Sequence, residues 1–187
     1  QFNCNGYLVV ENLITKPVLE AVKAEYADLL DALYAGWQAD GLVPEAVPNS
    51  KFWDKLALAI KGGFDWYQPF DISLPLDNIT NDTPMHFGPA VFDMIISDQI
   101  LDTVECLIGS EITSNPIQHV RIKPPERDVR DGETRAHIIS TDWHQDRAVT
   151  LKSADQTKMV TVWLAITDAT VENGCLQVKP GRTHEMI

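Results

Sequence analysis

Apolar residues in the first half of the chain are spaced as in amphipathic helices. From Thr15 to Trp37 they recur at three- and four-residue steps, which predicts a helix with one apolar face. Thr15 is a suitable N-cap, and Pro17 is tolerated in the first turn of a helix. Shorter stretches of the same kind predict further helices over 50–62 and 97–108. The N-terminal part is therefore expected to be helical.

The second half has the alternating pattern that is typical of β-strands. Residues 112–123 are rich in β-branched side chains, and 136–143 is a second candidate strand. The clearest strand pattern covers 158–167, with one face formed by Val160, Val162, Leu164 and Ile166. Helices over 1–110 followed by strands over 111–187 predict an α+β fold, with the helices packed on one face of a mainly antiparallel sheet.

Composition and charge exclude several classes of protein. The chain has 187 residues, of which 44% are hydrophobic and 22% are charged, as expected for one globular domain over 1–187. Its 15 basic and 27 acidic residues give a net charge of −12, which argues against a nucleic-acid-binding protein. No apolar run is long enough to span a membrane. Three widely spaced cysteines without a CxxC motif favour a reduced, cytoplasmic protein, and the oligomeric state stays open.

The main candidate for chemistry is the segment Trp143-His144-Gln145-Asp146. In an extended chain, residues i and i+2 point to the same side, so His144 and Asp146 would present an imidazole and a carboxylate together. Such a pair suits a divalent metal, especially iron(II), in a two-histidine, one-carboxylate site that leaves coordination positions open. The alternative for so short a motif is an ordinary polar pair on the surface.

Several further segments appear in a fixed order around this motif. They are Arg121-Ile122-Lys123-Pro124-Pro125 upstream, and Val162-Trp163-Leu164-Ala165-Ile166, Glu172-Asn173-Gly174-Cys175-Leu176 and Val178-Lys179-Pro180-Gly181-Arg182-Thr183-His184 downstream. Together they resemble the phytanoyl-CoA dioxygenase family of iron(II)- and 2-oxoglutarate-dependent oxygenases. The resemblance implies a double-stranded β-helix, a cupin-like jelly-roll of two antiparallel sheets with N-terminal helices packed on one sheet.

The resemblance also implies a metal site. His144 and Asp146 correspond to the first two iron ligands. The third histidine ligand, and an Arg or Lys for the 2-oxoglutarate carboxylate, are expected beyond Ile187, on strands after the Pro180-Gly181 turn. His184 belongs to that turn, which does not carry the ligand in the family.

Three more residues are assigned by resemblance to the cosubstrate pocket. Trp163 falls where the family often has an aromatic contact to 2-oxoglutarate, and His119 falls on a strand that lines the pocket. Arg121 has the same parity as His119, so it is expected to face the same side and to meet a carboxylate. The alternatives are core packing for Trp163 and a surface ion pair for Arg121.

The activity implied is hydroxylation of a C–H bond in a small-molecule substrate, with O2 as oxidant and 2-oxoglutarate converted to succinate and CO2. A carboxylate at Asp146 favours hydroxylation, because related halogenases carry a small residue there and bind chloride instead. Two alternatives stay open. One is a non-catalytic jelly-roll binding module or pseudoenzyme with an incomplete iron site, and the other is a hydrolytic zinc site. The sequence does not indicate the substrate.

Overall fold

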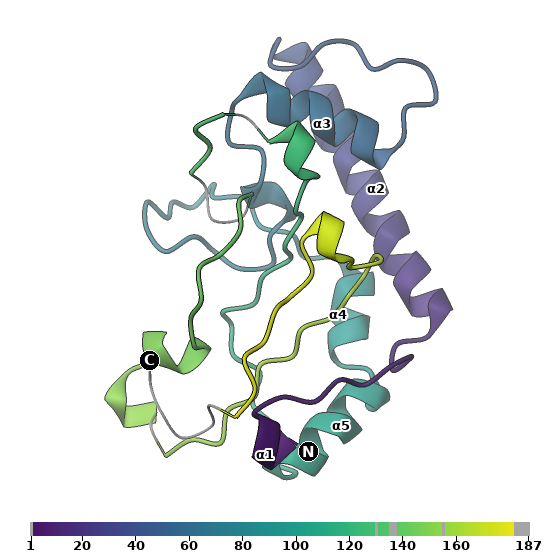
Figure 1. The fold of residues 1–187 in the computed structure, drawn as a ribbon. Helices are drawn as coiled ribbons and strands as arrows, with labels where there is room; N and C mark the ends of the chain where they lie inside the picture. Colours follow the sequence, from purple (N-terminus) through teal and green to yellow (C-terminus); the bar gives the residue numbers. More distant parts are fainter. Residues whose placement is uncertain (1, 130, 135–137, 155, 182–187) are drawn as a thin grey trace.

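The regular secondary structure of the protein is concentrated in its first 110 residues (Figure 1). The structure is a computed structural model that describes residues 2–129, 131–134, 138–154 and 156–181. The α-helices are α1 (Phe2–Asn5), α2 (Lys16–Ala39), α3 (Phe52–Gly62), α4 (Pro89–Ile95) and α5 (Asp98–Ile108). Short 3-10 turns are η1 (Gln68–Phe70), η2 (Glu126–Asp128), η3 (Asp146–Val149), η4 (Lys152–Ala154) and η5 (Val171–Asn173).

The three helices predicted from the spacing are confirmed. Helix α2 begins after Thr15 with Pro17 in its first turn, and α5 begins after Ser97. Helix α3 has Lys51 as its N-cap, one residue after Ser50, and begins at Phe52. The carboxylate of Asp54 accepts a hydrogen bond of 2.9 Å from the Lys51 N–H, which satisfies a free donor at the start of that helix.

Helix α4 was not predicted, because its seven residues are too few to show a periodic pattern. A side chain from α2 stabilises it instead. The carboxylate of Glu25 accepts hydrogen bonds from the N–H groups of Ala90 (2.7 Å) and Val91 (3.3 Å) and lies 3.0 Å from His86 Nε2. A Cβ atom on Gly88 would lie 2.0 Å from Glu25 Oε1, so only glycine leaves room for this contact.

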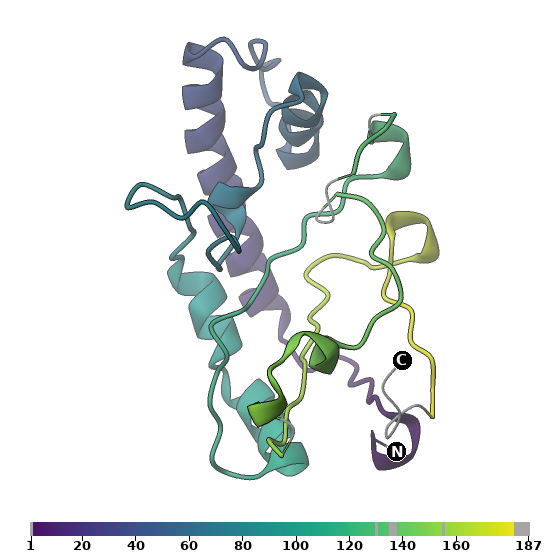
Figure 2. The ribbon, with the colours of Figure 1, turned by 90° about the vertical axis from the view of Figure 1, so that its left-hand side faces the viewer.

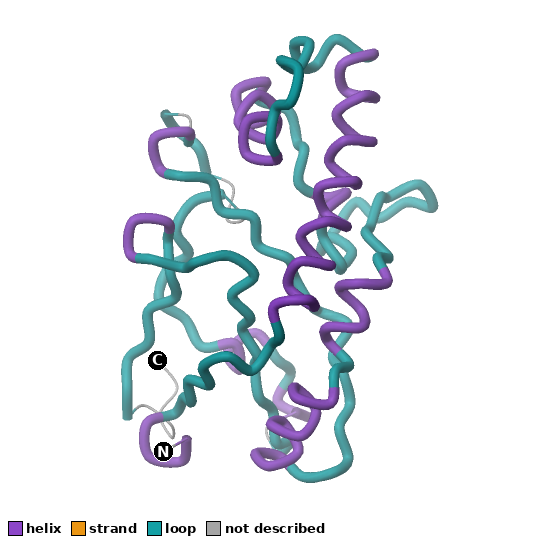
Figure 3. Tube along the Cα trace, turned by 90° about the vertical axis from the view of Figure 1, so that its right-hand side faces the viewer, coloured by secondary structure: helices purple, strands orange, loops and turns teal. Residues whose placement is uncertain are grey.

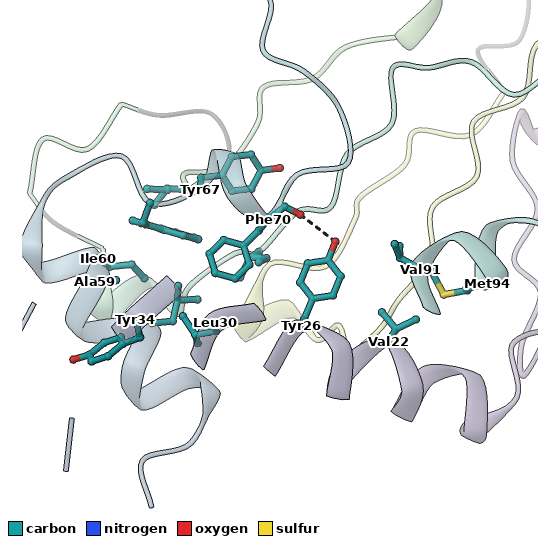
Figure 4. Packing of buried hydrophobic residues seen from close by; sticks show 14 of the residues in the cluster. Val22, Tyr26, Leu30, Tyr34, Ala59, Ile60, Tyr67, Phe70, Val91 and Met94 are labelled. Carbon is teal, nitrogen blue, oxygen red and sulfur yellow. Dashed lines mark hydrogen bonds between the residues drawn. The ribbon is translucent and has the colours of Figure 1, made fainter. Parts of the chain in front are cut away.

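The hydrophobic core lies on one face of α2. Its side chains Val22, Tyr26, Leu30 and Tyr34 are buried at four-residue steps, and α3 and α4 both pack against the same helix. The hydroxyl of Tyr26 donates a 3.0 Å hydrogen bond to the carbonyl oxygen of Phe70, as Figure 4 shows. This core therefore joins α2, α3, α4 and η1 into one packed body.

The jelly-roll predicted for residues 111–187 is wrong for this structure. No segment of the described residues forms a β-strand, and Figure 3 shows this part of the chain as loops and short turns. Residues 136 and 137 of the candidate strand 136–143 lie outside the described residues. Within the described part, no ladder of backbone hydrogen bonds joins this segment to 112–123 or 158–167. An alternating pattern specifies which side chains face the core, but a sheet also needs a neighbouring segment at hydrogen-bonding distance. The prediction of an α+β fold with a double-stranded β-helix rested on the alternating pattern alone, and no neighbouring segment pairs with these residues in the described part.

The second half instead runs beside the helical body as long loops (Figures 1 and 2). The alternation predicted for 158–167 survives in part, because Val160, Leu164 and Ile166 pack against the core while Val162 is 45% exposed. Gly181 N–H donates a 3.0 Å hydrogen bond to the Asn5 carbonyl oxygen, so this loop returns to α1. Within the part of the chain described, no helix combines the length and the apolar character needed to cross a membrane.

Candidate functional site

The structure brings the side chains of His144 and Asp146 together. Gln145 between them is extended, with φ −121° and ψ 128°, so its two neighbours face the same side. His144 Nε2 lies 3.3 Å from Asp146 Oδ1. The two side chains are 57% and 50% exposed, which leaves them accessible to a ligand from solution.

Each of these side chains is also held by its other polar atom. His144 Nδ1 lies 2.7 Å from the carbonyl oxygen of Asp142. A carbonyl oxygen can only accept, so Nδ1 carries a proton, and in the neutral ring Nε2 has a lone pair directed at Asp146. The other oxygen of Asp146, Oδ2, accepts a 2.7 Å hydrogen bond from Thr161 Oγ1. A nitrogen lone pair and a carboxylate oxygen therefore face each other, an arrangement that favours a cation between them: a proton or a metal ion.

The distance between these two atoms fits adjacent positions around a first-row metal. Ligand atoms roughly 2.0–2.2 Å from a metal and at right angles to each other lie about 3 Å apart. The observed 3.3 Å is close to this separation. The described residues contain no group of three or more His, Cys, Asp or Glu side chains placed to hold a metal ion. His137 and His184 lie outside the described residues. The pair thus matches the separation of two adjacent ligand positions.

His119 lies in a separate cluster built around the buried side chain of Asp71, which is 3% exposed. Asp71 Oδ2 lies 2.7 Å from His119 Nδ1, and Oδ1 accepts a 3.1 Å hydrogen bond from the Val120 N–H. The hydroxyl of Tyr67 donates a 2.6 Å bond to the carbonyl oxygen of Val120. Both backbone groups of Val120 are thereby bound to the η1 region, and His119 is oriented with Nδ1 toward Asp71 and Nε2 away from it.

Arg121 belongs to the same cluster. Burial raises the pKa of Tyr67, the negative charge of Asp71 raises it further, and the positive charge of Arg121 opposes the shift. Burial also lowers the pKa of Lys123, and the charge of Arg121 adds to that effect. Lys123 Nζ donates to the carbonyl oxygen of Ile139. His119 thus contacts Asp71, and Arg121 lies close enough to Tyr67 to lower its pKa.

Trp163 lies on the outward side of its segment and is 47% exposed. Complete burial in the core, the alternative role for this residue, is therefore not observed. Thr161, two positions earlier, is also exposed and is the residue that reaches Asp146. The exposed indole of Trp163 thus lies in the same segment as the residue that contacts Asp146.

Two residues of these clusters were missed from sequence. Asp71 lies between Phe70 and Ile72, and a carboxylate between two apolar residues is a signal from which a buried acid could have been predicted. Thr161 has the same parity as Trp163, and this is a signal from which its position on the Trp163 side of the segment could have been predicted.

Non-haem iron oxygenases hold their metal with two histidines and one carboxylate, and His144 and Asp146 bring together one side chain of each kind. The sequence model of the phytanoyl-CoA dioxygenase (PhyH) family matches residues 2–186. Because this match covers nearly the whole chain, the protein belongs to that family. Members of the family are generally dioxygenases that use iron(II) and 2-oxoglutarate. No curated protein and no solved structure matched the chain.

Proposed function

We propose that the protein is an iron(II)- and 2-oxoglutarate-dependent dioxygenase that hydroxylates a C–H bond of a small organic substrate. The observation that carries this proposal is the distance of 3.3 Å between His144 Nε2 and Asp146 Oδ1. The other polar atom of each side chain is hydrogen-bonded, His144 Nδ1 to the Asp142 carbonyl oxygen and Asp146 Oδ2 to the Thr161 hydroxyl. Family membership supports the choice of cofactor, and the approach of His144 to Asp146 supports these two residues as its ligands.

In this proposal His144 and Asp146 hold iron(II), and a third ligand comes from outside the described residues. When bound, iron(II) and 2-oxoglutarate supply an oxidation in which one oxygen atom of O2 enters the substrate C–H bond and the other enters succinate, with release of CO2. The carboxylate of Asp146 occupies the position that a halide would need, so hydroxylation is favoured over halogenation. The Asp142 carbonyl accepts from Nδ1–H of His144, so in the neutral ring the lone pair on Nε2 is available to the metal.

His119, Arg121 and Trp163 are proposed to bind the cosubstrate. Arg121 is an exposed residue, and a guanidinium can bind a carboxylate group through two parallel hydrogen bonds. Asp71 orients His119 through its Nδ1 atom, so that Nε2 is directed away from Asp71. The exposed indole of Trp163 offers an apolar surface for the carbon chain of the bound acid. The free cysteines Cys4, Cys106 and Cys175 favour a reducing compartment, and we place the activity in the cytoplasm.

The test is oxygen consumption coupled to succinate formation, with iron(II) and 2-oxoglutarate supplied. We expect the wild-type protein to form succinate and the His144→Ala and Asp146→Ala variants to lose this activity. Asp142→Ala is the matched control, because it removes an exposed acid two residues from His144 and keeps the backbone carbonyl that His144 needs. Wild-type turnover in His144→Ala or Asp146→Ala would contradict the ligand assignment.

A non-catalytic binding module is the second candidate. It is favoured by the observation that the described residues form no jelly-roll and bring no third ligand to the His144–Asp146 pair. Metal analysis and turnover distinguish the candidates. Iron bound without any succinate formation would favour the binding module, and zinc bound in place of iron would favour the hydrolytic alternative.

A further inference from the structure

We propose that Thr161 is a positioning residue of the metal site, whose hydroxyl fixes the Asp146 carboxylate so that one defined oxygen faces the metal. This inference rests on the proposed function, because it assumes that His144 and Asp146 bind a cation. It adds a residue that does not touch the metal itself and lies 15 positions away in the chain.

The two oxygens of Asp146 have different partners. Oδ2 accepts the Thr161 hydroxyl at 2.7 Å, and Oδ1 lies 3.3 Å from His144 Nε2. A carboxylate has no proton to give, so Thr161 is the donor. With Oδ2 engaged, rotation of the carboxylate costs a hydrogen bond to a charged group, and Oδ1 stays directed at the metal position. Thr161 therefore favours binding through one oxygen.

The contact is poorly explained as a stabiliser of the fold. Asp146 is half exposed and Thr161 is exposed, so water competes with the hydrogen bond and its net contribution to folding is small. Hydrogen bonds to metal ligands act differently, because they orient the ligand and keep it basic, and their loss typically lowers metal affinity. An exposed bond that orients a candidate ligand is thus expected to affect binding more than stability.

The two candidate ligands also differ in how they are held. A backbone carbonyl, that of Asp142, fixes His144, so no side-chain substitution removes that bond. A side-chain hydroxyl fixes Asp146, so a single substitution does remove it. This makes position 161 a place where the geometry of the site can be altered without changing either ligand.

The experiment compares Thr161→Val, which keeps the shape and loses the hydroxyl, with Thr161→Ser, which keeps the hydroxyl. The readout is the dissociation constant for Co(II), used as a spectroscopic stand-in for iron(II), together with the urea midpoint of each variant. We expect Thr161→Val to weaken Co(II) binding by about 10- to 100-fold. Thr161→Ser is expected to bind as the wild type does, and neither variant should shift the urea midpoint.

Wild-type affinity in Thr161→Val would overturn the positioning role while leaving the dioxygenase proposal intact. Equal weakening in Thr161→Ser and Thr161→Val would also overturn it, since the hydroxyl would then not be the group that matters. Failure of the proposed function looks different: Co(II) binding that is absent in the wild type, or unchanged in His144→Ala, would contradict both proposals.

Discussion

Residues 2–110 and residues 111–181 bury their apolar side chains to very different extents. Nearly all of the buried apolar residues lie in the first part, and after residue 110 only Ile122, Pro124 and Ile138 join them among the described residues. In the second part, Leu151 is 79% exposed and Val171 is 82% exposed. The helical body supplies the core, and the loops that carry the candidate metal ligands lie against it.

The two parts are joined by a few specific contacts. Asp71 and Tyr67 bind both backbone groups of Val120, and Gly181 donates to the Asn5 carbonyl oxygen. Most of the buried apolar side chains and the candidate metal ligands therefore lie in different parts of the chain. Substitutions in the helical body should therefore affect folding, and substitutions near His144 should affect binding.

The largest expected effect is the loss of a core aromatic side chain. Trp66 is fully buried, and Trp163 is 47% exposed. We expect Trp66→Ala to lower the free energy of unfolding by about 3–5 kcal/mol, because it removes a large buried side chain and leaves a cavity. Trp163→Ala should cost less than about 1 kcal/mol. Urea unfolding of both variants measures this, and equal losses would contradict the division of the chain into a packed body and attached loops.

The next effect concerns the contact between the two parts. Asp71→Ala leaves His119 Nδ1 and the N–H groups of Val120 and Ile72 without the carboxylate that accepts from them. We expect the free energy of unfolding to fall by about 1–3 kcal/mol and hydrogen exchange at Val120 to accelerate. The exposed Asp82→Ala variant is the control. Unchanged exchange at Val120 in Asp71→Ala would show that Asp71 does not hold this segment.

A smaller effect should appear as a dependence of stability on pH. Burial alone would raise the pKa of Glu25, but hydrogen bonds from His86 and from the Ala90 and Val91 N–H groups lower it overall. A lowered pKa in the folded state means that the stabilisation is fully present above the unfolded value of roughly 4.3. It is lost as the pH falls through the folded value.

We therefore expect Glu25→Gln to be less stable than the wild type at neutral pH and to lose less stability on acidification. Thermal midpoints between neutral and acidic pH measure this difference, and Glu105→Gln on the exposed side of α5 is the control. A Glu25→Gln variant with the full acid sensitivity of the wild type would show that the Glu25 carboxylate does not stabilise α4.

The smallest effect on folding is expected at the candidate metal site. His144→Ala and Asp146→Ala remove side chains that are at least half exposed, so the free energy of unfolding should change by no more than about 0.5 kcal/mol. The same variants should lose metal binding. Urea midpoints measured beside metal affinity test this separation, and a large loss of stability in either variant would argue for a structural role of the pair.

Local patterns predicted the parts of the molecule that depend on neighbouring residues. Helix α2 and the approach of His144 to Asp146 both follow from spacings of a few positions in the sequence. Helix α4 was missed because its seven residues show no periodic pattern and because Glu25, which binds its first N–H groups, lies 65 residues before Ala90. The jelly-roll was wrong because strand pairing is set by distant partners, which an alternating pattern does not identify. Thr161 was missed for the same reason, since its contact with Asp146 joins separate segments.

The central claim is that the His144–Asp146 pair binds iron(II), and an anaerobic iron(II) titration tests it most directly. We expect one equivalent of iron(II) to bind to the wild type and to Asp142→Ala, and binding to be lost in His144→Ala and in Asp146→Ala. Iron(II) binding of wild-type strength in either of the last two variants would contradict the account.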